Sequence, residues 1–381
     1  MKIGIDKIAF YSPGLYINLS DLAIERKIDP DKFLIGIGQI QMSVPSMMQD
    51  TITMAINASN KILTKEDKEK IDLVIFATES SVDQSKSGAT FIHKLLELNN
   101  YSRSIEIKQA CYGATAGIQL GYSHILNQPE SKVLVIASDI ARYGLDTAGE
   151  PTQGAGSVAI LLTKNPSILE IENKSSYYTE DIFDFYRPNY SDLAIVDGKY
   201  SNDKYQEFFS KTYNAYMGKY QMSVNDFDAF CFHIPYTKIG LKSLRMIADE
   251  TKSPNLFENY KLATIYNKRV GNIYTGSLYL SLISLLEQGN LKKNDRIGLY
   301  SYGSGAVGEF FSLRVVDGYK NCLQKASHEK MLDSRIQLTI DEYENIFKNN
   351  YTETLKNKIK NENTIVYFNG VVDHKRIYLK K

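Results

Sequence analysis

The order of apolar segments repeats in the two halves of this chain. Continuous apolar runs, which predict strands covered on both faces, occur at residues 72–78, 133–138, 157–163, 227–233, 296–302 and 309–316. His233 follows Glu79 by 154 residues and Asn272 follows Cys111 by 161, each at the matching point of its half. We therefore expect a duplicated α/β unit that brings these four residues to one site, and chance recurrence of short apolar runs is the alternative.

Helices are expected between these strands, over residues 47–63, 87–98, 114–126, 208–220, 238–250 and 276–288. The chain changes character after Val316. Residues 317–360 are mostly polar and predict helices, and residues 364–379 predict a hairpin that turns at Asn369-Gly370. We interpret this last part as an appendage to the duplicated core.

The stretch IKQACYGATAG, residues 107–117, predicts a strand that ends at a cysteine and passes directly into a helix of small residues. The helix dipole and the unpaired N–H groups of a helix start favour a thiolate, which is the nucleophilic form of cysteine. Cys111 is therefore a candidate nucleophile, and a buried structural cysteine is the alternative. Cys231, inside an apolar strand, and Cys322, in the appendage, are interpreted as structural.

Glu79 and His233 each end an apolar strand. Burial at such a position raises the pKa of a carboxyl group towards the range of a general base. The histidine is suited to donate a proton or a hydrogen bond to a carbonyl group. An exposed loop carboxylate and an ordinary core histidine are the alternatives for the two residues, respectively.

Composition excludes several classes of function. The formal net charge of +1 gives no sign of a nucleic-acid partner or a membrane surface. The N-terminus lacks the apolar segment of a signal peptide, and no apolar run approaches the roughly 20 residues of a spanning helix. Three scattered cysteines form neither a disulfide framework nor a metal-binding pattern, so we expect a cytoplasmic protein without a metal. The segment Gly36–Gln41 lacks the third glycine of a dinucleotide-binding loop.

Eight motifs occur together and in order along the chain. They are ATES at 77–80, QACYG at 109–113, ASDIA at 137–141, PTQGAG at 151–156, IVDGKYS at 195–201, FHIPYTK at 232–238, GNIYTGS at 271–277 and YGSG at 302–305. With these motifs the chain resembles the 3-hydroxy-3-methylglutaryl-CoA synthases of the short bacterial type, within the thiolase-like superfamily. The resemblance implies a layered αβαβα core formed by an N-terminal half (1–165) and a C-terminal half (166–318), with an appendage at 319–381. Fold analogy further implies a homodimer.

The resemblance also implies a reaction. Acetyl-CoA acylates Cys111, a base removes a proton from the acetyl methyl group, and the carbanion attacks the ketone of acetoacetyl-CoA before water releases the product. Glu79 matches the general base and acid, and His233 matches the residue that binds and polarises acetoacetyl-CoA. The backbone N–H groups of Cys111 and Ser304 match an oxyanion hole. No cofactor is implied, because the coenzyme A thioesters are substrates, and the product would serve the mevalonate route to isoprenoids.

Further positions match residues that contact substrate in the family. These are Asp29, Tyr143, Thr147, Thr152, Ser201, Lys238, Lys242, Asn272 and Ser304. Lys238 and Lys242 are four residues apart, so they share a helix face on which two ammonium groups can hold the phosphates of coenzyme A. Ala114 stands where animal members have glycine, and Thr147 where they have asparagine. The loop 146–151 is one residue longer than theirs, which makes Thr147 the least secure match.

Three other functions fit parts of the pattern. A ketoacyl-acyl-carrier-protein synthase III-like enzyme shares the fold, but loss of carbon dioxide makes its carbanion and it needs no carboxylate base. Glu79 therefore favours the condensation with acetyl-CoA. A polyketide β-branching enzyme uses the same chemistry with a ketone bound to a carrier protein. The pair Lys238 and Lys242 could bind the phosphopantetheine arm of either coenzyme A or the carrier protein. An inactive thiolase-fold scaffold is opposed by the complete set of Cys111, Glu79 and His233.

Overall fold

The computed structural model describes residues 1–360 and 362–381. Its largest feature is a sheet with the strand order β11-β12-β13-β8-β1-β7-β6-β4-β5. The strands are β1 (Ile3–Tyr11), β4 (Ile71–Ala77), β5 (Arg103–Ile107), β6 (Lys132–Ala141), β7 (Gly154–Lys164), β8 (Leu169–Thr179), β11 (Ala229–Phe232), β12 (Arg296–Gly303) and β13 (Val307–Val315). All six strands expected from apolar runs are present, which confirms the α/β class.

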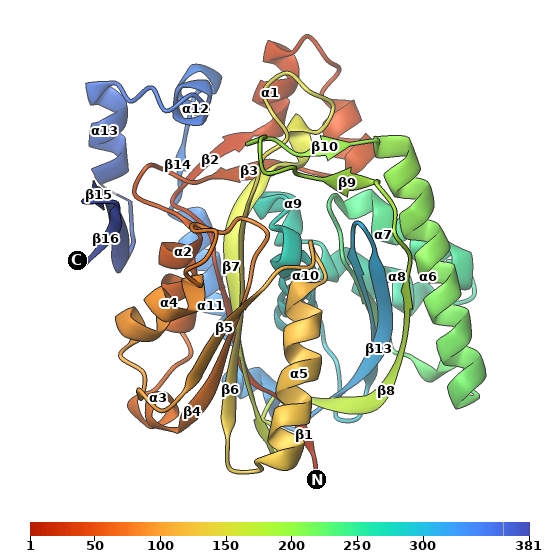
Figure 1. Ribbon diagram of the computed structural model, residues 1–381. Coiled ribbons are helices and arrows are strands. Elements are labelled where there is room, and N and C mark those ends of the chain that lie inside the picture. The colour runs from red at the N-terminus through yellow and green to blue at the C-terminus, as the bar shows by residue number, and fades with distance from the viewer. Residues whose placement is uncertain (361) are drawn as a thin grey trace.

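The sheet bends into two half-sheets that face each other. They meet where β1 pairs with β8 over only two residue pairs, Gly4 with Glu170 and Ile5 with Leu169. The helices α5 (Gly113–Asn127) and α10 (Ser277–Gln288) lie between the half-sheets, as Figure 1 shows. The result is the duplicated, layered core expected for a thiolase-like fold, whereas the domain boundaries at 165 and 318 stay a prediction.

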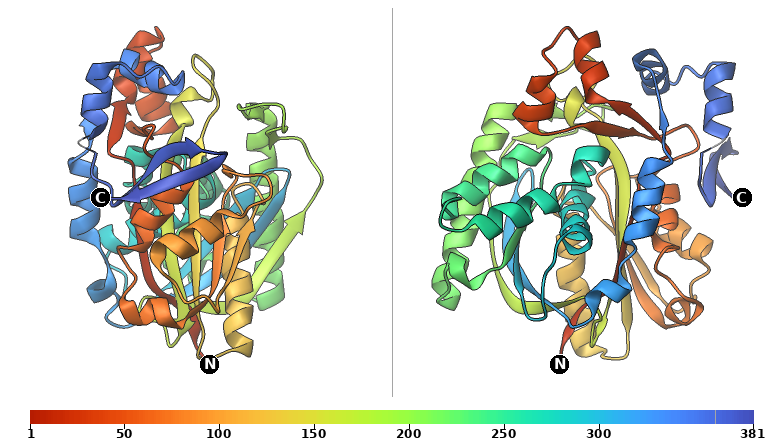
Figure 2. Two further views of the ribbon diagram at one scale, coloured as in Figure 1. Left: turned by 60° about the vertical axis from the view of Figure 1, so that its left-hand side comes forward. Right: turned by 180° about the vertical axis from the view of Figure 1, so that it is seen from behind.

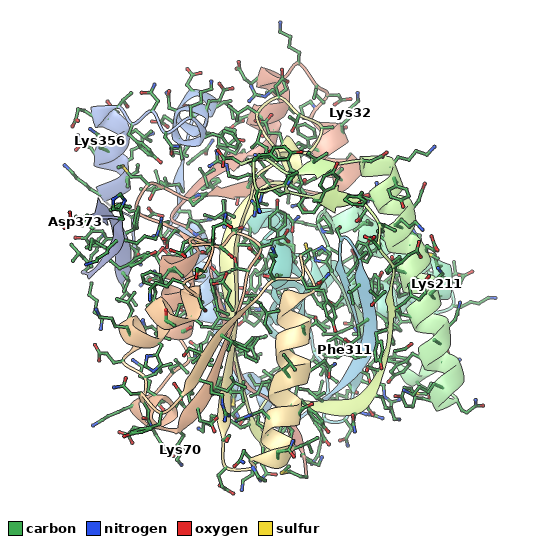
Figure 3. All side chains as sticks on the ribbon, viewed as in Figure 1. Lys32, Lys70, Lys211, Phe311, Lys356 and Asp373 are labelled. Atoms are coloured by element: carbon green, nitrogen blue, oxygen red, sulfur yellow. The ribbon has the colours of Figure 1, made fainter. Side chains whose placement is uncertain are left out.

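Other helices cover the outer faces. The outer helices are α2 (Thr51–Ser59), α3 (Lys65–Lys70) and α4 (Gly88–Leu96) in the first half, and α6 (Gly198–Tyr220), α7 (Thr237–Ile247) and α8 (Pro254–Ala263) in the second. The short helix α9 (Asn267–Val270) packs instead against α10 and β7. Figure 3 shows Phe311 of β13 inside the molecule, whereas Lys70 and Lys211 point outward. The apolar core is therefore divided into layers by the sheets. No described helix is long and apolar enough to cross a membrane.

Some element boundaries differ from those predicted. Helix α2 begins only at Thr51, because Asp50 and Thr53 form a capping box there. Helix α6 begins ten residues before the predicted Phe208, because Asp197 accepts a hydrogen bond from the N–H of Tyr200 and caps it. The polar first turns of α6 have no apolar periodicity, so the pattern revealed only its second half.

The appendage joins the core along a smaller sheet. Strand β14 (Ile336–Gln337) extends β2 (Leu15–Asn18), which pairs with β3 (Gln41–Val44). The first half also contains α1 (Leu19–Glu25) and the π-helix η1 (Lys32–Ile37). The remaining appendage elements are α11 (Lys325–Asp333), α12 (Ile340–Phe347), α13 (Glu353–Lys360), β15 (Val366–Val372) and β16 (Lys375–Lys380). Figure 2 shows the terminal hairpin lying against the helices of the first half.

The predicted position of the hairpin turn is wrong. Strands β15 and β16 reverse at Asp373-His374, where φ is 48° and 63°, respectively, and Val372 pairs with Lys375. Two positive φ values suit the two-residue hairpin turn that follows the strand twist. Gly370, with φ of 108°, lies inside β15 at a shift of register after Phe368. The Asn-Gly pair therefore forms a bulge rather than the turn.

We predict that His328→Leu destabilises the protein by about 1–3 kcal/mol, because it leaves the buried N–H of Phe10 without its acceptor. The fully buried His328 of α11 accepts a hydrogen bond from the N–H of Phe10 (3.1 Å), and its Nδ1 lies 2.8 Å from Oε1 of Glu287. Urea unfolding followed by circular dichroism measures the change, with the exposed Lys325→Ala on the same helix as the control. A loss equal to that of the control would contradict this attachment of the appendage.

Candidate active site

Cys111 lies in a tight turn between the two halves. Strand β5 ends at Ile107, Ala110 has a φ of 42°, and Tyr112 caps helix α5. A Cβ atom on Gly303, at the end of β12, would lie only 2.5 Å from the carbonyl oxygen of Gln109. Glycine is therefore needed at 303 for the second half to approach the cysteine turn this closely.

The Cys111 thiol and the Glu79 carboxyl group are in direct contact. Sγ of Cys111 lies 3.2 Å from Oε1 of Glu79, and Cys111 is only 8% exposed. Burial raises the pKa of the thiol well above its usual value, and the nearby carboxyl groups of Glu79, Asp139 and Asp184 raise it further. The expectation that the helix start makes Cys111 a thiolate is therefore wrong, because burial and the nearby negative charges outweigh the helix dipole.

Glu79 has the electrostatics expected of a buried base. Burial, followed by the charge of Asp139, raises the pKa of Glu79 to about 8, although the thiol of Cys111 and the charge of Arg187 act to lower it. The guanidinium of Arg187 also donates a hydrogen bond to the backbone carbonyl of Glu79. The predicted upward shift of the Glu79 pKa is confirmed.

Asp139 is a buried acid that the sequence reasoning did not select. Its Oδ1 accepts hydrogen bonds from the Glu79 N–H (2.8 Å) and the Thr78 hydroxyl (2.9 Å), and its Oδ2 accepts one from the Thr275 hydroxyl (2.6 Å). It therefore joins the end of β4 to the turn at residues 274–276 that precedes α10. The motif ASDIA contained this residue, and its polar side chain in an apolar strand was the available signal.

Asp184 is a second acid that the sequence reasoning missed. It is fully buried, and it accepts hydrogen bonds from the Tyr302 hydroxyl (2.7 Å), the Gly305 N–H (2.9 Å) and the Ser201 hydroxyl (3.2 Å). Asp184 thus holds the loop around Ser304 against the start of α6. Its surroundings in the sequence carry no periodic pattern, so no local signal marked it.

His233 follows β11 directly and is 2% exposed. The backbone N–H of His233 donates a hydrogen bond to the carbonyl of Tyr300 (2.8 Å), and its backbone carbonyl accepts one from the hydroxyl of Tyr205 (2.6 Å). Burial lowers the pKa of the imidazole to about 3, so the ring is neutral near pH 7. Within the described chain its buried Nδ1 has no hydrogen-bond partner.

Asn272 and Tyr143 form the other wall of the cysteine pocket. Asn272 Oδ1 accepts from the N–H of Tyr274 and the hydroxyl of Ser277, both at 2.9 Å, and Nδ2 donates to the Tyr143 hydroxyl at 3.3 Å. Tyr143 and Phe185 pack against the cluster that contains Cys111. Asn272 lies before the turn η4 (Tyr274–Gly276), and α10 begins within one residue of the predicted position 276.

The remaining predicted residues lie further from the thiol. Thr147 and Asp29 are exposed, and the hydroxyl of Thr152 donates to the carbonyl of Gly149. Lys238 and Lys242 lie on α7, the first half-buried and the second exposed. The side-chain hydrogen bond of Cys111 is to Glu79 and not to any of these five residues, so their roles stay predictions.

A cleft of about 1140 Å³ opens beside the site. It is lined by Glu79, Ser304 and the segment around Arg187, and on its far side by residues of the appendage. The described part of the chain has no group of histidine, cysteine and acidic side chains suited to a metal ion. The chemistry available at the site is therefore that of a thiol, a carboxyl group of raised pKa and a neutral imidazole.

Comparison with known proteins places this site in a family. The models described as "Hydroxymethylglutaryl-coenzyme A synthase N terminal" and "C terminal" match residues 1–167, and 168–256 with 248–378, respectively. The chain belongs to the hydroxymethylglutaryl-CoA synthase family. The hydroxymethylglutaryl-CoA synthase of Enterococcus faecalis is 49% identical over 368 residues, covering 94% of this chain and 96% of the relative. The resemblance inferred from the eight sequence motifs is confirmed.

Other relatives differ in the carrier that their names state. The polyketide biosynthesis 3-hydroxy-3-methylglutaryl-ACP synthase PksG of Bacillus subtilis is 32% identical, covering 91% of this chain and 88% of the relative. A crystal structure of an HMG-CoA synthase complexed with CoA has a TM-score of 0.95 at 43% identity and covers both chains fully. A structure of MvaS in complex with 3-hydroxy-3-methylglutaryl coenzyme A has a TM-score of 0.89 at 30% identity, covering 100% of this chain and 99% of that one.

We predict that Glu79→Gln shifts the alkylation of Cys111 by iodoacetamide to lower pH. The substitution removes the negative charge next to the sulfur, so it favours the thiolate and lowers the pKa of the thiol. Mass spectrometry of the Cys111 peptide, after short exposures across a pH series, gives the midpoint. Glu106→Gln, which removes a carboxylate elsewhere on the cleft, is the control. An unchanged or higher midpoint in Glu79→Gln would show that the carboxyl group does not set the state of the thiol.

Proposed function

We propose that this chain condenses acetyl-CoA with acetoacetyl-CoA and water to give 3-hydroxy-3-methylglutaryl-CoA and CoA through an acetyl-Cys111 intermediate. The observation that carries the proposal is the 3.2 Å contact between the thiol of Cys111 and a carboxyl group of raised pKa. Membership of the family and the identity to the Enterococcus faecalis enzyme support the choice of reaction.

The contact supports a sequence of proton transfers. As the sulfur attacks the acetyl carbonyl, its proton passes to Glu79, and the leaving thiolate of CoA takes that proton from Glu79. Glu79, again ionised, then removes a proton from the methyl group of acetyl-Cys111. The carbanion forms a bond to the ketone carbon of acetoacetyl-CoA, the ketone oxygen becomes an alkoxide, and Glu79 returns its proton to that oxygen. Water finally cleaves the thioester and regenerates the thiol.

His233 serves the second substrate in this proposal. Because its imidazole is neutral near pH 7, His233 donates a hydrogen bond to the ketone oxygen and does not act as a charged imidazolium that transfers its proton. The N–H groups of Cys111 and Ser304 serve the oxyanion of the acyl transfer, a contribution worth about 3 kcal/mol for each donor. Asp184 supports the second donor by holding Gly305.

Coenzyme A binding is assigned to the residues that match the family. Lys238 and Lys242 would pair with phosphate groups of coenzyme A, and Asn272 and Tyr143 would face the acyl group. Asp29, Thr147, Thr152, Ser201 and Ser304 complete the proposed contacts. No cofactor is required, because the carbanion is stabilised by its own thioester. The family alternative is a carrier-bound ketone, and the lower identity to the polyketide enzyme favours free acetoacetyl-CoA.

The same proposal includes the oligomeric state, the cellular location and the pathway of the enzyme. Strand β5 is an edge of the large sheet and exposes Ile105 (41%), and helix α5 beside it exposes Leu120 and Leu126. An exposed edge strand with apolar neighbours suits pairing with a second copy, which supports a homodimer. We assign the reaction to the cytoplasm and to the mevalonate route to isoprenoids.

We predict that Glu79→Gln is still acetylated on Cys111 by acetyl-CoA, because loss of the neighbouring charge eases ionisation of the thiol even though its proton must pass to solvent. The variant should condense about 10²–10⁴-fold more slowly, because it lacks the base that forms the carbanion. Mass spectrometry reports the acetyl group, and the loss of acetoacetyl-CoA absorbance reports condensation. Wild-type protein with label on Cys231 or Cys322, and none on Cys111, would overturn the assigned nucleophile. Near-normal condensation by the variant would place the base elsewhere.

We predict that His233→Ala impairs the use of acetoacetyl-CoA more than the acetylation of Cys111, because the imidazole is assigned to the second substrate. Steady-state kinetics with varied acetoacetyl-CoA, beside the single-turnover rate of acetylation, separates the two effects. Lys325→Ala serves as a surface control. A folded His233→Ala protein that cannot be acetylated would refute the assigned role.

A further inference from the structure

Helix α5 has a polar face that points away from its own half of the molecule. Tyr112, Thr115 and Gln119 share this face, as their spacing of three and four residues requires. The Thr115 hydroxyl contacts the hydroxyls of Tyr279 (2.7 Å) and Ser301 (2.8 Å), which belong to the second half. The adjacent face carries Ala114 and Ile118, which pack into the apolar core.

Glu309 lies at the centre of this polar contact. It belongs to β13, opposite Ser301 of β12, and is 2% exposed. The Tyr112 hydroxyl donates to its Oε2 at 2.6 Å, and the Gln119 amide donates to its Oε1 at 2.8 Å. Burial raises the pKa of this carboxyl group, whereas hydrogen bonds from Tyr112, Ser175 and Gln119 lower it. The acid therefore joins α5 of the first half to β8 and β13 of the second.

We propose that Glu309 is a positioning residue, which fixes the nucleophile turn through Tyr112. Tyr112 adjoins Cys111, and its backbone lies against Gly303, where a Cβ atom would approach the Tyr112 nitrogen to 2.7 Å. The residue is thus held at its backbone by β12 and at its hydroxyl by Glu309. The inference rests on the proposed role of Cys111 as the nucleophile.

The physical reason is that hydrogen bonds are directional, whereas apolar packing is not. An apolar helix face tolerates small rotations, and a buried acid with several donors is satisfied in only one arrangement. Rotation of α5 would carry Cys111 away from Glu79 and lengthen their contact. A displacement of about 1 Å at a reacting group can slow a reaction by about 10²-fold, so a buried acid remote from the chemistry can control its rate.

The test uses Glu309→Gln, Tyr112→Phe and the double variant that combines these two substitutions. Gln119→Met is the control, because it removes a different hydrogen bond to the same carboxylate, seven residues from Tyr112. We expect the two single variants to slow the single-turnover acetylation of Cys111 by about 10-fold to 100-fold. We expect the double variant to be no slower than the worse single variant, because both act through one contact. Gln119→Met should match their loss of stability in urea without slowing acetylation.

Three results would overturn the inference. These are a normal acetylation rate in Glu309→Gln, an equal slowing in Gln119→Met, and additive effects in the double variant. If Glu309→Gln does not fold, Tyr112→Phe decides the question, because it removes a single hydroxyl group. Alkylation of Cys111 by iodoacetamide, which needs no natural substrate, should shift to lower pH in Glu309→Gln and Tyr112→Phe and not in Gln119→Met, because the thiol then lies further from the Glu79 carboxylate. Wild-type protein that is alkylated but never acetylated would refute the proposed function, while these pH shifts would still test Glu309.

Discussion

The contact between the thiol of Cys111 and the carboxyl group of Glu79 is the interaction that the rest of the structure serves. Both groups are held in a pocket where burial makes a negative charge unfavourable, so Glu79 can keep a proton that an exposed carboxyl group would lose near pH 7, and the thiol stays neutral. The first half supplies both residues, from the end of β4 and the start of α5. The second half closes the pocket with Gly303 and the loop that Asp184 holds.

Proton placement distinguishes this site from one that relies on a preformed thiolate. The thiol is neutral, the imidazole of His233 is neutral near pH 7, and the Glu79 pKa lies close to the pH of the cell. A base of this pKa can take a proton from the thiol and later from a methyl group without being strongly biased towards either state. In the proposed mechanism, the half-buried carboxyl group of Glu79 supplies the reactivity that the helix dipole alone does not.

The sequence predicted the strands and the reacting pair because both depend on strong local patterns. Glu79 and Cys111 stand where an apolar run ends or a helix of small residues begins, and such points face the site in any α/β fold. Asp184 was missed because its partners Tyr302 and Gly305 are distant in sequence and its own surroundings are irregular. The neutral state of the Cys111 thiol was missed because it depends on burial and on acids from separate strands. Asn369-Gly370 misled the turn assignment because the β15 strand continues past it to pair with β16.

The most direct test of this account is hydrogen exchange at the acetyl methyl group. Wild-type protein is incubated in D₂O with acetyl-CoA and no acetoacetyl-CoA, and the acetylated Cys111 peptide is examined by mass spectrometry. The account predicts that the acetyl group gains deuterium in the wild type and not in Glu79→Gln, because the carboxylate forms the carbanion before the second substrate reacts. Condensation without any exchange into the acetyl group, together with release of carbon dioxide from a malonyl thioester, would contradict it.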